Sequence, residues 1–174
     1  MQNKKEISIY NIIKSLSYAM DLISETVVGH HKKVAYIALQ IGRKMNLTNH
    51  RLKKLVLPAL IHDLGVFYLN KHFSDLSFDK RSNKHAEIGY NLLNKYFPEP
   101  EISEIIFYHH HNWEENQSTI PACSHILHLA DRIAVVIKSE NDILNQVDHI
   151  NKLIKKNSGS RFWPEAVDKF NILA

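Results

Sequence analysis

The sequence predicts an all-α protein that folds as a single domain. Apolar residues recur with the 3.6-residue period of a helix in segment after segment along the 174-residue chain. A chain of this length can bury a substantial core and is typical of one domain. We therefore expect a bundle of about seven helices over residues 1–174, with an N-terminal helix in 1–24 and the core in 25–174.

The composition, 44% hydrophobic and 23% charged, is typical of a soluble globular protein. No apolar run reaches the roughly 18 residues of a membrane-spanning helix, and the start lacks the apolar region of a signal peptide. The single cysteine, Cys123, rules out an internal disulfide and fits a reducing cytoplasm. Lysine and arginine lie in small scattered groups, and the net charge is +4. These features favour a cytoplasmic protein with no DNA and no membrane partner.

The first two helices are expected over 7–24 and 29–45. In the second, His30, Val34 and Ile41 share one face, so His30 lies on the buried side near the helix start. A buried core histidine is an ordinary alternative to a ligand at this position. His31 points away from that face, and we expect it to be exposed to solvent.

The third helix is expected over 49–63, with His62 on its apolar face. Pro58 should kink or restart it, because proline lacks an N–H group and crowds the preceding turn. Gly65 is a plausible stop signal. Residues 66–83 have mixed polarity, which predicts a loop with one short helix at most, placed as a lid or a wall beside His62-Asp63.

Two further helices are expected, from 82 or 83 to 96 and from 101 to 111. Gly89 lies one turn after His85 and would allow another element to pack closely. His109 follows the apolar face of the next helix, and His110 lies about 100° around it, so both can reach inward only near the helix end. A solvated polar helix end is the alternative for this histidine run.

The remaining helices are expected from Pro121 to about residue 138, from 139 to about 159, and a short one from Pro164. Asp131 lies inside a long apolar run, so its carboxylate must be paired or ligated. Arg132 is adjacent and should face another direction, which argues against a simple ion pair between the two.

Seven of these polar residues form one set of potential metal ligands: His30, His62, Asp63, His85, His109, His110 and Asp131. Five imidazoles with two carboxylates suit iron, manganese, cobalt, nickel or zinc better than magnesium or calcium. Seven ligands exceed the needs of one such ion but fit two divalent ions that share a bridging carboxylate. Metal pairs of this kind serve in-line displacement at phosphorus.

The order of these residues resembles the HD superfamily of metal-dependent phosphohydrolases, and most closely its HD-GYP branch, which hydrolyses cyclic di-GMP. Residues 60–65, LIHDLG, are similar to the LLHDIG motif of that branch, and residues 29–34 to its GHSxRV segment. Residues 85–89 resemble HPxxG, and residues 108–113 resemble YHHERW. Ala130-Asp131 and residues 158–165 resemble the AD and SGxxFDPE segments.

The resemblance implies an HD-type helical bundle with a binuclear centre. His30, His62, Asp63 and Asp131 would hold one ion, and Asp63, His85, His109 and His110 the other. Asp63 would be the catalytic residue, as the bridging ligand that positions an attacking hydroxide. The substrate would be a nucleotide or a cyclic dinucleotide, with cyclic di-GMP as one candidate, and a homodimer remains open.

The chain also departs from the HD-GYP pattern. Val66 replaces the usual lysine after HDIG, Trp113 leads into Glu114-Glu115 rather than a GYP loop, and Glu140 lies where basic residues are usual. Lys80, Arg81, Lys84 and Trp113 are the candidate substrate-binding residues. The alternative function is a catalytically impaired signalling or protein-interaction module that keeps its metal site.

Overall fold

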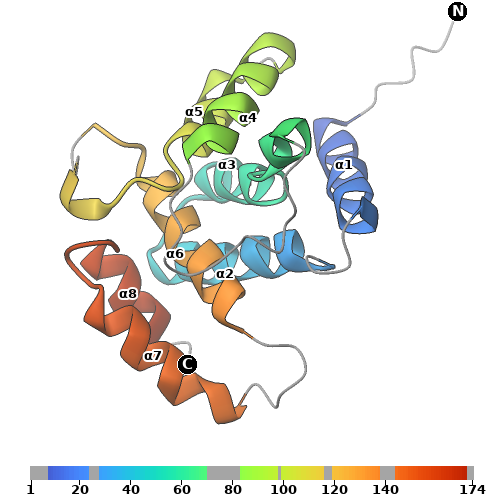
Figure 1. Ribbon diagram of the computed structural model, residues 1–174. Coiled ribbons are helices and arrows are strands. Elements are labelled where there is room, and N and C mark those ends of the chain that lie inside the picture. The colour runs from blue at the N-terminus through green and yellow to red at the C-terminus, as the bar shows by residue number, and fades with distance from the viewer. Residues whose placement is uncertain are drawn as a thin grey trace, which may run out of the picture.

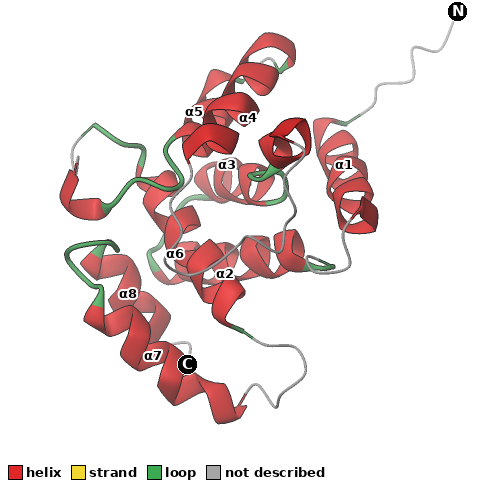
Figure 2. Ribbon diagram, in the orientation of Figure 1, coloured by secondary structure: helices red, strands yellow, loops and turns green. Residues whose placement is uncertain are grey.

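The computed structural model describes residues 8–23, 28–69, 83–97, 99–115, 119–137 and 144–171. Its α-helices are α1 (Ile9–Ile23), α2 (His30–Lys44), α3 (Asn49–Ala59), α4 (Asn83–Tyr96), α5 (Pro100–Phe107), α6 (Ala122–Val136), α7 (Val147–Lys156) and α8 (Pro164–Asn171). Within these ranges three 3₁₀-helices accompany them: η2 (Leu64–Leu69), η4 (Trp113–Glu115) and η5 (Leu144–Gln146). The described ranges contain no β-strand, which confirms the all-α prediction (Figure 2).

The centre of the fold is formed by α2, α3 and α6, which pack against one another (Figure 1). Helix α6 is buried along almost its whole length, from Cys123 to Ala134. Helices α4 and α5 pair at one side of this centre, and α5 contacts it mainly through α3 and also through α6. Helices α7 and α8 lie at the opposite side, and α1 lies beside α2. No helix among the described residues is long and apolar enough to cross a membrane.

Helix α3 ends at Ala59, earlier than the predicted end at Asp63. Pro58 cannot donate a backbone hydrogen bond. Beyond it the backbone hydrogen bonds change from a spacing of four residues to a spacing of three. The N–H of Leu60 lies 3.2 Å from the carbonyl oxygens of both Val56 and Leu57, and the N–H of Ile61 bonds to Pro58 at 3.0 Å. His62 and Asp63 therefore lie on a turn, which lets two adjacent side chains face the same region.

Helix α5 also ends earlier than predicted, at Phe107, so His109 and His110 lie on the turn that follows it. This explains how His109 and His110 both face inward, which an α-helix would not allow at adjacent positions. The predicted helix from residue 139 is observed as η5 and α7; residues 138–143 lie outside the described part. Of the predicted lid-like segment 66–83, residues 66–69 belong to η2, residue 83 begins α4, and residues 70–82 lie outside the described part. The boundary between 1–24 and 25–174 stays a prediction.

Candidate metal centre

The seven residues predicted as ligands come together at the centre of the bundle. His30 begins α2, Asp131 lies on α6, and His85 lies in the first turn of α4. The other four are on the turns that follow α3 and α5. None of the seven is more than 7% exposed, so the seven form a buried polar cluster.

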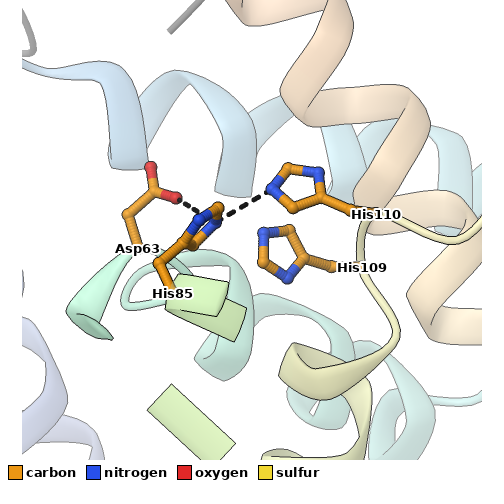
Figure 3. Close-up of side chains that lie close together, drawn as sticks. All are labelled: Asp63, His85, His109 and His110. Atoms are coloured by element: carbon orange, nitrogen blue, oxygen red, sulfur yellow. Dashed lines mark hydrogen bonds and ion pairs between the residues drawn. The ribbon is translucent and has the colours of Figure 1, made fainter. Parts of the chain in front are cut away.

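The ligand atoms form two groups that share Asp63. Asp63, His85, His109 and His110 make one group, and His30, His62 and Asp63 make the other. Within each group the ligand atoms lie within 4.8 Å of one another. Figure 3 shows the first group, with the Asp63 carboxylate directed at His85 and the His110 ring on the far side of His85.

The two oxygens of Asp63 face different groups. Oδ1 lies 3.4 Å from Nε2 of His85. Oδ2 lies 3.2 Å from Nε2 of His62 and 3.8 Å from Nε2 of His30. One carboxylate therefore stands between the two sets of imidazoles, as a bridging ligand would.

Backbone carbonyl groups orient two of the imidazoles. The Nδ1–H group of His62 donates to the carbonyl of Ala59 at 3.0 Å, and that of His109 donates to Ile106 at 2.5 Å. In each ring this leaves Nε2 directed at the cluster. Ring orientation by a hydrogen bond at the other nitrogen is typical of histidines that bind metal.

Asp131 is held by Arg132, which corrects the expectation that the two side chains diverge. Nε and Nη2 of Arg132 donate to Oδ2 of Asp131 at 3.0 and 2.5 Å. Arg132 is only 1% exposed, so its long side chain folds back to the nearest carboxylate instead of following the helix period outward. Oδ1 stays turned to the cluster, 3.2 Å from Nε2 of His30 and 3.6 Å from Nε2 of His62.

His31 is fully buried, which contradicts the prediction that it faces solvent. Helix α1 packs beside the start of α2 and covers the side of the helix that the residue pattern marked as exposed. Nδ1 of His31 lies 3.4 Å from Oδ1 of Asp21 on α1, and Nε2 lies 3.8 Å from Oδ2 of Asp63. The sequence analysis did not place His31 in the cluster. The one feature that could have indicated it is its position directly after His30 at the start of a helix.

The charges of the cluster are set by burial and by a few close pairs. Burial opposes ionisation of Asp63, but His62 outweighs it and holds the pKa of this carboxyl well below its usual value. Burial likewise opposes ionisation of Asp131, and Arg132 leads the interactions that lower its pKa. Burial also disfavours a charged His62, yet Asp63 and Asp131 together raise its pKa to about 10.

Burial makes His85, His109 and His110 favour the neutral form. Burial, followed by the charge of His62, lowers the pKa of His109 to about 3. Burial is also the main reason why the pKa values of His85 and His110 are lowered. Neutral imidazoles beside ionised carboxylates are the protonation states that bind metal ions.

The residues present fit a divalent transition-metal ion. Buried polar atoms of the cluster make no hydrogen bond of good geometry, although they converge on a common space; they are Nε2 of His30, His62 and His109, Oδ2 of Asp63 and Oδ1 of Asp131. A cluster of this kind is unfavourable unless a shared partner satisfies it. Nε2 of His110 and Nε2 of His85 lie 2.9 Å apart, which is close to the separation of two nitrogens bound to one ion at about 2.1 Å.

Three further histidines lie outside the cluster. His125 and His128 are buried on α6, and the Nδ1–H group of His128 donates to the carbonyl of His111 at 3.1 Å. His149 is exposed on α7.

The predicted substrate-binding residues are only partly placed by the structure. Lys84 is exposed in the first turn of α4, next to His85. Trp113 is half-buried, stacked on Trp163 with ring centres 5.4 Å apart. Lys80 and Arg81 lie outside the described residues.

Comparison with known families matches residues 27–135 to the HD domain. This range is more than half of the chain and includes all seven residues of the cluster. The chain is also similar to the 3'3'-cGAMP-specific phosphodiesterase 1 of Vibrio cholerae, with 26% identity over 102 residues. The aligned part is 58% of this chain but 24% of that protein, so the chain spans about a quarter of the length of this curated relative.

Proposed function

The chain belongs to the HD domain family, and we propose that it is a metal-dependent phosphohydrolase with two divalent transition-metal ions at its centre. The observation that carries the proposal is the position of Asp63. Its two oxygens face different sets of imidazoles, and it belongs to both groups of ligand atoms. The two groups would hold one ion each, and the metal would be iron, manganese, cobalt, nickel or zinc, which these donors suit.

The chain's own residues would hold and orient the reacting groups. When bound, two such ions activate water and neutralise charge on the phosphate oxygens of an in-line displacement. Asp63 would fix the distance between the ions and the place of the attacking water. Arg132 would keep Oδ1 of Asp131 turned to His30 and His62, because it occupies the other carboxylate oxygen. Burial of all seven ligands excludes bulk water from the reacting centre.

The substrate we propose is a nucleotide or cyclic dinucleotide with a phosphodiester bond. The Vibrio cholerae relative is named as a phosphodiesterase specific for 3'3'-cGAMP, which supports this class. Lys84 stands exposed one position before His85, where a cation can meet a phosphate at the edge of the centre. Lys80, Arg81 and Trp113 remain further proposed contacts to the substrate.

A non-catalytic signalling or protein-interaction module that keeps its metal site is the second candidate. Two described features favour it. Val66, in the place of the lysine that follows HDIG in HD-GYP proteins, is only 6% exposed and carries no charge. Glu114 and Glu115 are exposed in η4 and add negative charge where the GYP loop would lie. Both features weaken the attraction of a dianionic substrate.

Turnover of a generic phosphodiester separates the two candidates. Protein loaded with manganese or iron without oxygen is incubated with bis(p-nitrophenyl) phosphate, and nitrophenolate release is followed. Metal-dependent turnover that falls at least ~100-fold in Asp63→Asn is expected of a hydrolase. Asp148→Asn, an exposed acid on α7, is the matched control and should keep the wild-type rate. Metal-loaded wild type that is no faster than the metal-free protein would favour the non-catalytic module.

A further inference from the structure

Helix α1 lies outside the part of the chain that matches the HD domain, yet it reaches the metal centre. Asp21, near the end of α1, is only 8% exposed. Its Oδ1 lies 3.4 Å from Nδ1 of His31, and its Oδ2 lies 3.3 Å from Nζ of Lys32. A buried carboxylate from a separate helix therefore contacts the residue next to His30.

His31 reaches the cluster by its other nitrogen. Nε2 of His31 lies 3.8 Å from Oδ2 of Asp63, the same separation as that between Nε2 of His30 and this oxygen. The ring centre of His31 lies 5.4 Å from those of both His30 and His62. Three imidazoles thus surround the same oxygen of Asp63.

These separations are compatible with one shared ion. Two ligand atoms bound to an ion at about 2.1 Å lie at most about 4.2 Å apart. The separations of 3.8 Å from Oδ2 of Asp63 meet this limit for both His30 and His31. The ligand atoms of His30, His62 and Asp63 lie within 4.8 Å of one another and His31 is outside that group, so its ring would move closer to the other two imidazoles when the ion binds.

The contact between Asp21 and His31 matches the carboxylate–histidine–metal arrangement that is common in metal sites. A carboxylate that accepts a hydrogen bond from Nδ1–H fixes the tautomer of a histidine and leaves Nε2 as the donor to the metal. His62 and His109 have this bond to backbone carbonyl groups, whereas His31 has it to a carboxylate.

We infer that His31 is a further ligand of the ion held by His30, His62 and Asp63, and that Asp21 of the N-terminal helix is the positioning residue that orients it. This inference deepens the proposed function and rests on it, because it needs an ion at that group. The consequence is that a helix outside the family match contributes to the metal affinity of the centre.

Cobalt titration of the full chain tests the inference. Co²⁺ is added to metal-free protein, and binding is followed by visible absorption, which reports the number and type of ligands. Relative to wild type, His31→Gln should weaken one of the two binding steps by about 100-fold and change the absorption band of that ion. Asp21→Asn should weaken the same step by about 10-fold.

Lys32→Met is the matched control. It removes the lysine that contacts Asp21 but leaves the imidazole in place, so affinity and spectrum should remain those of wild type. Thermal melting of each metal-free variant is measured as well, to show that it is folded. If His31→Gln does not fold, the cobalt affinity and spectrum of Asp21→Asn test the inference. Wild-type affinity and spectrum in His31→Gln, or in Asp21→Asn when the former is unfolded, would overturn the inference.

Failure of the proposed function has a different signature. Wild-type protein that binds no cobalt at this group contradicts the proposed centre itself, whatever the variants do. Wild type that binds two ions, with no effect of either substitution, contradicts only the role of His31 and Asp21.

Discussion

A Cβ atom on Gly65 would lie 2.0 Å from the carbonyl oxygen of His85. It would also lie 2.8 Å from the backbone nitrogen of Gly89, which confirms that Gly89 allows close packing of another element. Helix α4 therefore rests directly on the backbone of η2. Because Gly65 follows Asp63 by two residues, this contact brings His85 to its distance of 3.4 Å from the Asp63 carboxylate.

Gly65→Ala should both destabilise the protein and damage the metal centre. The clash is with backbone atoms, which cannot move aside as a side chain can, so α4 must shift. We expect the free energy of unfolding to fall by about 2–3 kcal/mol. The affinity of the group that contains His85 should fall with it. Urea unfolding in the presence of a chelator and a separate metal titration measure the two effects.

Gly159→Ala provides the control for this substitution. Gly159 has a φ of +85°, and no atom lies within 4 Å of its Cβ position. Alanine there should cost about 1 kcal/mol of backbone strain and leave metal affinity unchanged. Wild-type stability in Gly65→Ala would show that α4 is not held by this contact.

Metal should stabilise the wild-type protein but not Asp63→Ala. Ions that bind only the folded chain add about 2.7 kcal/mol of stability for each site at a concentration 100 times the dissociation constant. Removing Asp63 leaves two ions among neutral imidazoles and should abolish that gain. Thermal melting with and without chelator measures it, and metal analysis should give two ions per chain. One ion at most under metal-replete anaerobic conditions would contradict the binuclear centre.

The metal-free protein should lose stability on acidification below pH 6.5. Burial, followed by His111, lowers the pKa of His125 to about 4, and the pKa of His109 is about 3. Between these values and 6.5 the unfolded chain binds protons that the folded chain does not, so stability rises with pH in this window. Each such histidine contributes up to about 1.4 kcal/mol per pH unit.

His62 has the opposite sign, because its folded pKa is raised to about 10. Its contribution is present below pH 6.5 and is lost as the pH rises from 6.5 toward 10. Urea unfolding of the metal-free protein should therefore show a stability maximum near pH 6.5–7. His125→Gln, which leaves the metal centre intact, should make the acid slope shallower. A stability that does not change between pH 5 and 7 would contradict this account.

Cleavage of cyclic di-GMP should be weak even with both ions bound. The metal chemistry is common to phosphodiesters, whereas holding a second phosphate requires cations. Val66 is neutral and buried, and Glu114 and Glu115 are acidic. The main loss should therefore be in substrate affinity, which weakens the ground state and the transition state equally. The expected signature is a high KM with residual turnover of small phosphodiesters. A micromolar KM for cyclic di-GMP would show that these residues are dispensable.

Much of the fold followed from the sequence, because helical periodicity and end signals are local. Every α-helix among the described residues overlaps a predicted one, and the ends differ where tertiary contacts decide them. The end of α3 is the main case. Pro58 predicted a disturbance of the helix there. The tight turn that directs the side chains of His62 and Asp63 to the same region depends on the structure around it.

The set of seven polar residues was also readable from the sequence, since each stood at a position that a helix or its end directs inward. The family resemblance also implied two groups that share Asp63, and the structure brings six of the seven residues together in this way, with Oδ1 of Asp131 beside His30 and His62. The expectations that His31 faces solvent and that Arg132 points away from Asp131 were wrong for one reason. A helix period describes directions about one axis and does not say which neighbour covers the far side.

The sequence by itself thus determined the helices and the chemistry of the donor residues. The tertiary structure decided which donors meet. Helix α1 buries His31 and brings Asp21 to it, and the packed core turns Arg132 back to Asp131. These contacts join residues whose side chains diverge on their own helix or lie on different helices, so no local pattern in the chain encodes them.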